Sequence, residues 1–226
     1  MKVWVYVEGP SDRLALEALW NGWRNKMKAA GWGIHVLPLD TKTKFFNKIG
    51  ARASEKLLAY PNDLVIGLPD YYPNAPYAGQ EYQHNTLGDL FELQRRLVRE
   101  FLRRKVGDAD ILMQRFYPSA LKHDLEMLLL AACDQLRRHL RTSERLDNWI
   151  HPVEEQNQSQ PPKRIVEELY RAKKGRAYRD TKDSVAILSK VTDIQTLFYS
   201  DQGQLQCPVF KDMLDWVGDK TEVRAY

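Results

Sequence analysis

Residues 3–12, VWVYVEGPSD, combine a buried strand with a turn and the start of a helix. The run VWVYV is β-branched and aromatic without a charge, which is typical of a strand covered on both faces. Gly9 and Pro10 end the strand, and Ser11 is a suitable N-cap for the helix that follows. Glu8 therefore lies between a strand and a helix, where ligands bind in sheets of parallel strands.

The same alternation of strand and helix continues through the first 140 residues. We expect further strands over residues 34–39, 64–69 and 110–116. We expect helices between Ser11 and Gly31 and over residues 44–59, 86–105 and 121–140. This order favours an α/β, Rossmann-like fold in which a mostly parallel sheet carries helices on both faces.

The last part of the chain has a different character. Residues 151–162, HPVEEQNQSQPP, are polar and contain prolines, so we expect a loop or hinge there. Residues 163–217 read as helices separated by a short basic segment. We therefore predict an α/β domain over residues 1–150 and an α-helical C-terminal extension over residues 151–226 that packs on it.

The composition is that of a globular cytoplasmic protein. With 43% hydrophobic and 28% charged residues, the chain is not a disordered one. The longest wholly apolar run, residues 127–133, is too short to span a membrane, and the charged Glu8 soon after the N-terminus is unlike a signal peptide. Two distant cysteines exclude a disulfide scaffold and a CxxC zinc site. A net charge of +4 is compatible with nucleic acid.

Acidic side chains follow several of the expected strands. Glu8 follows the first strand with Asp12 one helical turn later, Asp70 follows the third, and Asp124 and Glu126 open the helix after the fourth. The carboxyl ends of parallel strands meet at one edge, where carboxylates repel one another unless a cation lies between them. Hard oxygen donors favour Mg²⁺ or Mn²⁺ over zinc. The structural alternative for Glu8 is a helix cap or a lysine pair.

Several residues near these acids in the sequence have both a functional and a structural interpretation. His123 could shuttle a proton or contact a phosphate, or it could pack against Tyr117 at the start of a helix. Asp124 fits a partner of its own helix dipole better than a metal ligand. Tyr71 and Tyr72 could stack on a base or form a wall of the cleft.

Basic residues gather in three clusters. On the helix 86–105, one stripe at four-residue spacing is a candidate phosphate contact: Arg95, Arg99 and Arg103. A second cluster, with Tyr170 and Tyr178 interleaved, suits single-stranded or looped nucleic acid and includes Lys163, Lys173, Lys174 and Arg176. A third, weaker cluster contains Arg137, Arg138, Arg141 and Arg145. A solvated helix face or an acidic protein partner is the alternative interpretation.

The order strand–Glu8-Gly9, helix, strand, helix, strand–Asp70 resembles a Toprim domain. VEGPSD at 7–12 resembles the first motif of the OLD-type nucleases, in which a glutamate is followed four residues later by Glu or Asp. LPDYYP at 68–73 resembles the second motif, normally Asp-x-Asp, but Tyr72 stands where the second aspartate would be.

Nearly the whole chain also resembles a Toprim-like family catalogued as domain-of-unknown-function 4276. In that family an aspartate is followed two residues on by tyrosine, as in DYY at 70–72, and a His-acid-x-Glu element opens a later helix, as in HDLE at 123–126. The family's proline-lysine and Cys-Pro-x-Phe segments resemble residues 162–163 and 207–210.

These resemblances imply Mg²⁺-dependent (or Mn²⁺-dependent) cleavage of phosphodiester bonds in DNA or RNA. Glu8 would be the general acid/base or a metal ligand, Asp12 and Asp70 would be metal ligands, and Glu126 would supply the carboxylate that Tyr72 lacks. A one-metal site, a substituted two-metal site and no catalysis all stay open. The resemblance further implies an ABC-type ATPase partner that controls this chain as a toxic effector in bacterial anti-phage defence. The chain has no Walker motif of its own.

Two other readings compete with the nuclease. The first is a catalytically inactive Toprim-fold subunit that binds an ATPase partner or nucleic acid, for which Tyr72 is the main support. The second is a phosphoryl-transfer enzyme for a small nucleotide, which would need no extended basic surface. The sequence leaves the oligomeric state open, and the C-terminal helices could form a dimer interface, a partner-binding surface or a lid.

Overall fold

The computed structural model describes residues 1–146, 149–156, 160–200 and 203–226. They group into two compact units, the first made of Met1–Arg13 and Arg24–Lys122 and the second of Leu14–Trp23 and His123–Tyr226. Helices α1 (Pro10–Leu19) and α2 (Asn21–Ala29) each contribute residues to both units. The division into domains 1–150 and 151–226 stays a prediction, because compactness alone does not show which segments fold independently.

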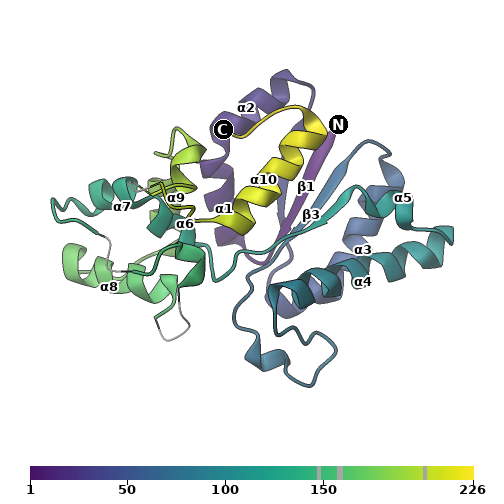
Figure 1. Cartoon of the computed structure of the whole chain (residues 1–226), viewed down its shortest axis with the longest axis horizontal. Coiled ribbons are helices and arrows are strands. Elements are labelled where there is room, and N and C mark those ends of the chain that lie inside the picture. The colour runs from purple at the N-terminus through teal and green to yellow at the C-terminus, as the bar shows by residue number, and fades with distance from the viewer. Residues whose placement is uncertain (147–148, 157–159, 201–202) are drawn as a thin grey trace. The chain divides into compact units, whose positions relative to one another are not determined.

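The first unit contains a four-stranded sheet in which all neighbouring strands are parallel, in the order β2–β1–β3–β4. The strands are β1 (Lys2–Val7), β2 (Gly33–Pro38), β3 (Leu64–Leu68) and β4 (Phe116–Pro118). Figure 1 shows β1 and β3 side by side. The predicted α/β, Rossmann-like fold with a parallel sheet is confirmed.

The central strand β1 is buried along five of its six residues. Trp4 and Tyr6 share a core with Phe45 and Phe46 of α3 (Lys42–Ala59). The valines between them point to the opposite face, because successive side chains of a strand alternate, and they are buried as well. Both faces of β1 are therefore covered, as its uncharged sequence predicts.

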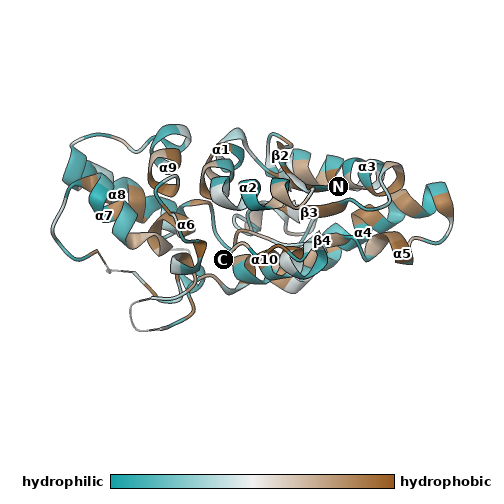
Figure 2. Ribbon diagram, turned by 90° about the horizontal axis from the view of Figure 1, so that it is seen from above, coloured by the Kyte–Doolittle hydropathy of each residue, from teal (hydrophilic) through white to brown (hydrophobic). Residues whose placement is uncertain are grey.

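Helices α3 and α4 (Leu87–Val106) pack against each other beside the sheet (Figure 1). Gly50 permits the close approach, because a Cβ there would lie 2.6 Å from the carbonyl oxygen of Leu97. Gly67 of β3 has the same role, since a Cβ there would lie 2.0 Å from Oε1 of Gln94. The Gln94 amide donates through Nε2 to the carbonyl of Ser119 at 2.9 Å. In Figure 2, β3 is hydrophobic in colour, whereas α4 carries both colours.

The predicted strand over 110–116 is wrong for most of its length. Residues Asp110–Met113 form the short helix α5, and the strand β4 begins only at Phe116. The backbone N–H of Asp110 donates to the Asp108 carboxylate, which supports a helical turn at this point. A short apolar run such as DILM does not distinguish a helix from a strand.

Two predicted helices are each divided in the structure. The helix expected between Ser11 and Gly31 breaks at Trp20 into α1 and α2. The helix expected over 121–140 begins later and divides at Ala132 into α6 (Glu126–Ala131) and α7 (Cys133–Leu140). The apolar periodicity continues across both breaks, so it does not reveal them.

The second unit is helical in the part of the chain that the structure describes. Besides α6 and α7 it contains η2 (Val153–Glu155), α8 (Pro162–Lys174), α9 (Asp180–Leu188), η3 (Ile194–Leu197) and α10 (Pro208–Thr221). The buried Glu154 carboxylate accepts hydrogen bonds from the backbone N–H groups of Val209 and Phe210 at 3.0 and 3.2 Å, which caps α10. The helices expected over 163–217 are confirmed.

Some predicted features extend beyond what the structure describes. The loop expected over 151–162 contains η2, and its residues 157–159 lie outside the described residues. No helix among the residues with described positions is long and apolar enough to cross a membrane.

Candidate functional site

The carboxyl ends of β1 and β3 lie next to each other in the sheet. From β1 the chain crosses to β2 on one side, and it later returns to β3 on the other. Such a reversal of strand order is the position at which open α/β sheets bind ligands. Glu8 follows β1 directly and Asp70 follows β3 by two residues, so both predicted acids are at this position.

Glu8 and Asp70 are joined by a hydrogen bond. The backbone N–H of Asp70 donates to Oε1 of Glu8 at 3.1 Å. Burial raises the pKa of Glu8 to about 7, the Lys42 ammonium opposes this shift, and the Asp12 carboxylate adds to it. A carboxyl group whose pKa is close to neutral can both give and take a proton under physiological conditions.

Asp12 is buried beside Glu8 and closes the first turn of α1. Its Oδ2 accepts a hydrogen bond from the backbone N–H of Gly9 at 2.8 Å, directly before the helix begins at Pro10. One carboxylate oxygen of Asp12 therefore has a structural role. The structure brings Asp12 together with Glu8 as the sequence predicts, and its role as a metal ligand stays a prediction.

Lys42 is a member of this site that the sequence analysis missed. Its side chain is 6% exposed, and Nζ donates to the carbonyl oxygens of Tyr71 at 2.6 Å and Pro73 at 2.8 Å. Burial lowers its pKa to about 8, although the charges of Glu8 and Asp70 oppose that shift. The sequence TKTKFF resembles a solvated helix start, so the pattern does not mark one of its two lysines as buried.

The segment after Asp70 packs closely on the first turns of α3. The Tyr77 hydroxyl lies 3.1 Å from Oγ1 of Thr43, and Tyr71 is buried with its hydroxyl donating to the carbonyl of Asn85. The rings of Tyr71 and Tyr72 are 4.4 Å apart. These contacts favour a wall of the site over base stacking as the role of Tyr71.

The predicted site residues His123 and Glu126 belong to the second unit. Both are buried, and Glu126 begins α6. Burial and the neighbouring Asp124 carboxylate raise the pKa of Glu126 to about 8, and the Lys163 ammonium opposes this shift. The structure therefore groups Glu126 with Asp124 and Lys163, and a metal or catalytic role for His123 or Glu126 stays a prediction.

Asp124 interacts with a second helix besides the expected one, because it contacts the backbone at the start of α6 and also that of α8. Its Oδ2 accepts a hydrogen bond from the backbone N–H of Lys163 at 3.3 Å, near the start of α8. The carboxylate therefore interacts with the positive end of α8 instead of only with the helix that follows it in sequence. The partner of Asp124 comes from a distant segment, so periodicity along the chain cannot predict it.

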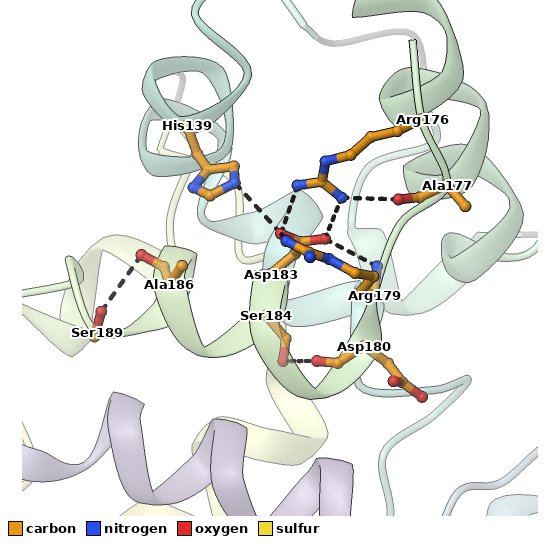
Figure 3. Close-up of polar contacts among 9 residues, drawn as sticks. All are labelled: His139, Arg176, Ala177, Arg179, Asp180, Asp183, Ser184, Ala186 and Ser189. Atoms are coloured by element: carbon orange, nitrogen blue, oxygen red, sulfur yellow. Dashed lines mark hydrogen bonds and ion pairs between the residues drawn. The ribbon is translucent and has the colours of Figure 1, made fainter. Parts of the chain in front are cut away.

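The second basic cluster is in part balanced inside the second unit (Figure 3). The guanidinium of Arg176 donates two hydrogen bonds to Asp183, at 2.7 and 2.8 Å. Arg179 donates to the same carboxylate from its backbone N–H at 2.9 Å and from its side chain at 3.4 Å, and Nε2 of His139 lies 3.8 Å away. Burial opposes the charge of Asp183, but the two arginines outweigh it and lower its pKa to about 2.

This pairing changes the interpretation of Arg176 and Lys173. The Arg176 guanidinium also lies over the Tyr170 ring at 5.1 Å, and Lys173 Nζ is 2.5 Å from the Glu144 carboxylate. Their charges have partners within the fold, so their predicted contacts with nucleic acid would compete with existing ion pairs. Lys163 and Lys174 are the other predicted contacts in this cluster, and Lys163 interacts with the buried acids described above.

The stripe on α4 is more exposed towards its C-terminus. Arg95 pairs with Glu92 at 2.6 Å, and Arg99 lies 3.8 Å from Asp110. Arg103 is exposed in the last turn, where a positive charge also favours the negative end of the helix. The stripe therefore combines a helix-stabilising role with a surface that a phosphate backbone could contact.

The carboxylates at the β1 and β3 ends fit a hard divalent cation. Nowhere in the described part of the chain are three or more His, Cys, Asp or Glu side chains grouped to hold a metal. Mg²⁺ does not need such a group, because proteins usually hold it with one or two carboxylates, waters and substrate phosphates. Glu8 and Asp70 meet that requirement, and a bound cation would lower the raised pKa of Glu8.

Comparison with known proteins identifies a family and no activity. A model of the family described as "Domain of unknown function (DUF4276)" matches residues 7–218. The chain belongs to this family. The match extends from the end of β1 into α10 and so includes residues of both units. Neither a curated protein nor a solved structure matches the chain.

Proposed function

We propose that this member of the DUF4276 family is a Toprim-like, Mg²⁺-dependent nuclease with Glu8 and Asp70 in its active site. The observation that carries the proposal is the hydrogen bond between two acidic residues at the reversal of strand order in a parallel sheet. Glu8 lies two residues before α1, but the first turn of that helix is already closed by Asp12, so capping does not require Glu8. The family match fits the proposal without naming an activity.

The chain's own groups have distinct parts in this chemistry. Glu8 and Asp70 would hold the cation, which when bound polarises a phosphate oxygen and lowers the pKa of a bound water. The Asp70 N–H fixes Oε1 of Glu8, which leaves the other oxygen for a cation or a proton. Asp12 adds negative charge beside Glu8 and so strengthens the attraction for a cation.

The wider biological role rests on the resemblance. We place the protein in the cytoplasm as an anti-phage effector whose activity an ABC-type ATPase partner restrains or releases. The exposed arginines of α4 support a nucleic-acid substrate, because phosphate contacts dominate the affinity of proteins for DNA and RNA.

A catalytically inactive subunit is the second candidate. Lys42 already supplies a positive charge beside Glu8 and Asp70, and Tyr72 occupies the position of a second aspartate. A site balanced in this way could be a remnant that stabilises the fold while the protein binds its ATPase partner.

The test is an assay of the purified protein, alone and with any ATPase encoded beside it. The substrates are plasmid, single-stranded DNA and total tRNA, each with Mg²⁺, Mn²⁺ or EDTA. We expect metal-dependent cleavage that falls at least about 100-fold in Glu8→Ala and in Asp70→Ala. Asp40→Asn is the matched control, because Asp40 is an exposed acid after β2 that pairs with Lys48 at 3.0 Å.

Each other outcome has a clear meaning. Cleavage that survives both alanine substitutions would place the active site elsewhere or reveal a contaminant. Absence of cleavage under every condition, together with tight binding to the ATPase, would support the inactive subunit.

A further inference from the structure

Lys42 brings a buried positive charge to the carboxylates of the candidate site. Three carboxylates of the first unit, Glu8, Asp12 and Asp70, interact with one another or with Lys42. With all three ionised and Lys42 protonated, these four side chains by themselves carry a charge of −2. One divalent cation balances this charge, whereas two would leave the group with an excess of positive charge.

We propose that Lys42 supplies a fixed positive charge in place of one metal ion, so that the site binds a single divalent cation per chain. The inference rests on the proposed function, because it concerns the same carboxylates. It gives Lys42 the role of a positioning residue and decides between the one-metal and two-metal sites that the sequence leaves open.

The ammonium of Lys42 is held by the backbone on the side of Asp70. Two of its three donors are used by the carbonyl oxygens of Tyr71 and Pro73, at 2.6 and 2.8 Å. Both carbonyls belong to the segment that directly follows Asp70, in which Tyr71 is buried. The positive charge is therefore fixed relative to Asp70 rather than free to move into solvent.

The packing around position 72 supports the same conclusion. This chain has Tyr72, which cannot ligate a cation with a carboxylate, and the centroid of its ring lies 4.4 Å from that of Tyr71. Tyr71 is itself anchored through its carbonyl to Lys42. Tyr72, which has no carboxylate, and the buried Lys42 therefore lie on segments that contact each other. This is expected if the charge of Lys42 substitutes for that of a metal ion.

Direct binding of Mn²⁺ to the full-length protein tests the proposal without any need for catalysis. Isothermal titration, with bound Mn²⁺ counted by electron paramagnetic resonance, is expected to give one ion per wild-type chain. Lys42→Gln is expected to bind the first Mn²⁺ ion about tenfold more tightly, because the substitution removes a positive charge that repels the ion. Lys42→Arg retains the charge and is expected to stay within about threefold of wild type.

Lys48→Gln is the matched control. It removes a lysine from the same helix whose ammonium is 3.0 Å from the exposed Asp40, outside the site. Its Mn²⁺ affinity is expected to equal that of wild type, which separates a local effect from a change in the charge of the whole protein.

The outcomes distinguish this proposal from the proposed function. Two ions per wild-type chain would overturn the proposal and leave a metal-dependent nuclease intact, and this result requires no variant to fold. One ion with unchanged affinity in a folded Lys42→Gln would likewise overturn only the role of Lys42. No bound Mn²⁺ in wild type would overturn both.

Discussion

The carboxylates of Glu8, which is half-buried, and Asp183, which is buried, are affected by their surroundings in opposite ways. Asp183 is 2% exposed and meets two arginines, and its pKa falls to about 2. Glu8 meets one lysine and another acid, and its pKa rises to about 7. A buried carboxylate with more than enough positive partners is stabilised as part of the fold. A carboxylate that has too few positive partners can still bind a cation or a proton.

The largest expected effect follows from removing the charge of Asp183. Asp183→Asn should lower the free energy of unfolding by about 2–3 kcal/mol, because the two arginines lose the carboxylate that balances them. This value is at the low end for a broken buried pair, because Arg176 and Arg179 are partly exposed. Urea denaturation, monitored by circular dichroism, measures this change in the free energy of unfolding. The matched Glu8→Gln should stay within about 1 kcal/mol of wild type, and an equal loss in both variants would refute the contrast.

The next effect is a pH dependence of stability in EDTA. The folded pKa of Glu8 is raised from 4.5 to about 7, so the folded state binds this proton more tightly than the unfolded state. Its contribution is fully present below pH 4.5 and is lost as the pH rises to about 7. Wild type should lose about 1–2 kcal/mol relative to Glu8→Gln across this window. Parallel stability curves for the two proteins would show that Glu8 titrates normally.

The contribution of Asp183 to stability depends on pH in the opposite direction from that of Glu8. Its folded pKa is lowered from 3.8 to about 2, so its contribution is present above pH 3.8 and is lost as the pH falls through 2. Asp183→Asn should therefore lose less stability than wild type as the pH falls from 3.8 to 2. Thermal melts at half-unit intervals measure both slopes in one experiment.

Arg176 and Arg103 allow a comparison between an arginine that is paired within the fold and one that is exposed to solvent. Arg176→Gln should reduce stability and leave nucleic-acid binding unchanged, because its guanidinium is held by Asp183. Arg103→Gln should leave stability nearly unchanged and reduce the slope of log affinity against log salt by about 0.7–0.9. Fluorescence anisotropy with a labelled oligonucleotide at several salt concentrations measures the slope. A weaker slope in Arg176→Gln would mean that its ion pair opens on binding.

The smallest expected effect concerns the third neighbour of Asp183. Burial lowers the pKa of His139, so this side chain is mostly neutral at pH 7 and adds little to the charge balance. His139→Asn should therefore change the free energy of unfolding by less than about 1 kcal/mol at pH 7. A loss as large as that of Asp183→Asn would mean that the imidazole is protonated in the folded protein.

The sequence predicts the parts of the fold that depend on local patterns. The uncharged run of β1 and the apolar spacing of α3 and α4 give these elements within a few residues, and acids after β1 and β3 indicate the edge at which they meet. Strand direction then brings Glu8 and Asp70 together, because parallel strands end at the same edge.

The features that the sequence does not reveal depend on partners from distant segments. Lys42 is one of several lysines near the start of α3, and only the carbonyls of Tyr71 and Pro73 distinguish it. Arg176 belongs to a basic run in the sequence, and its pairing with Asp183 of α9 within the fold is visible only in the structure. In both cases the residue type is visible in the sequence, but its partner is determined by tertiary packing.

The contact between Gly67 and Gln94 has a consequence for the history of the family. A side chain at position 67 would collide with Oε1 of Gln94, and moving Gln94 would break its hydrogen bond to Ser119. Neither position can therefore change freely while the other is retained. Among related sequences, an Ala or Ser at position 67 should be accompanied by a shorter residue at position 94, so the spacing between sheet and helix is inherited as a pair.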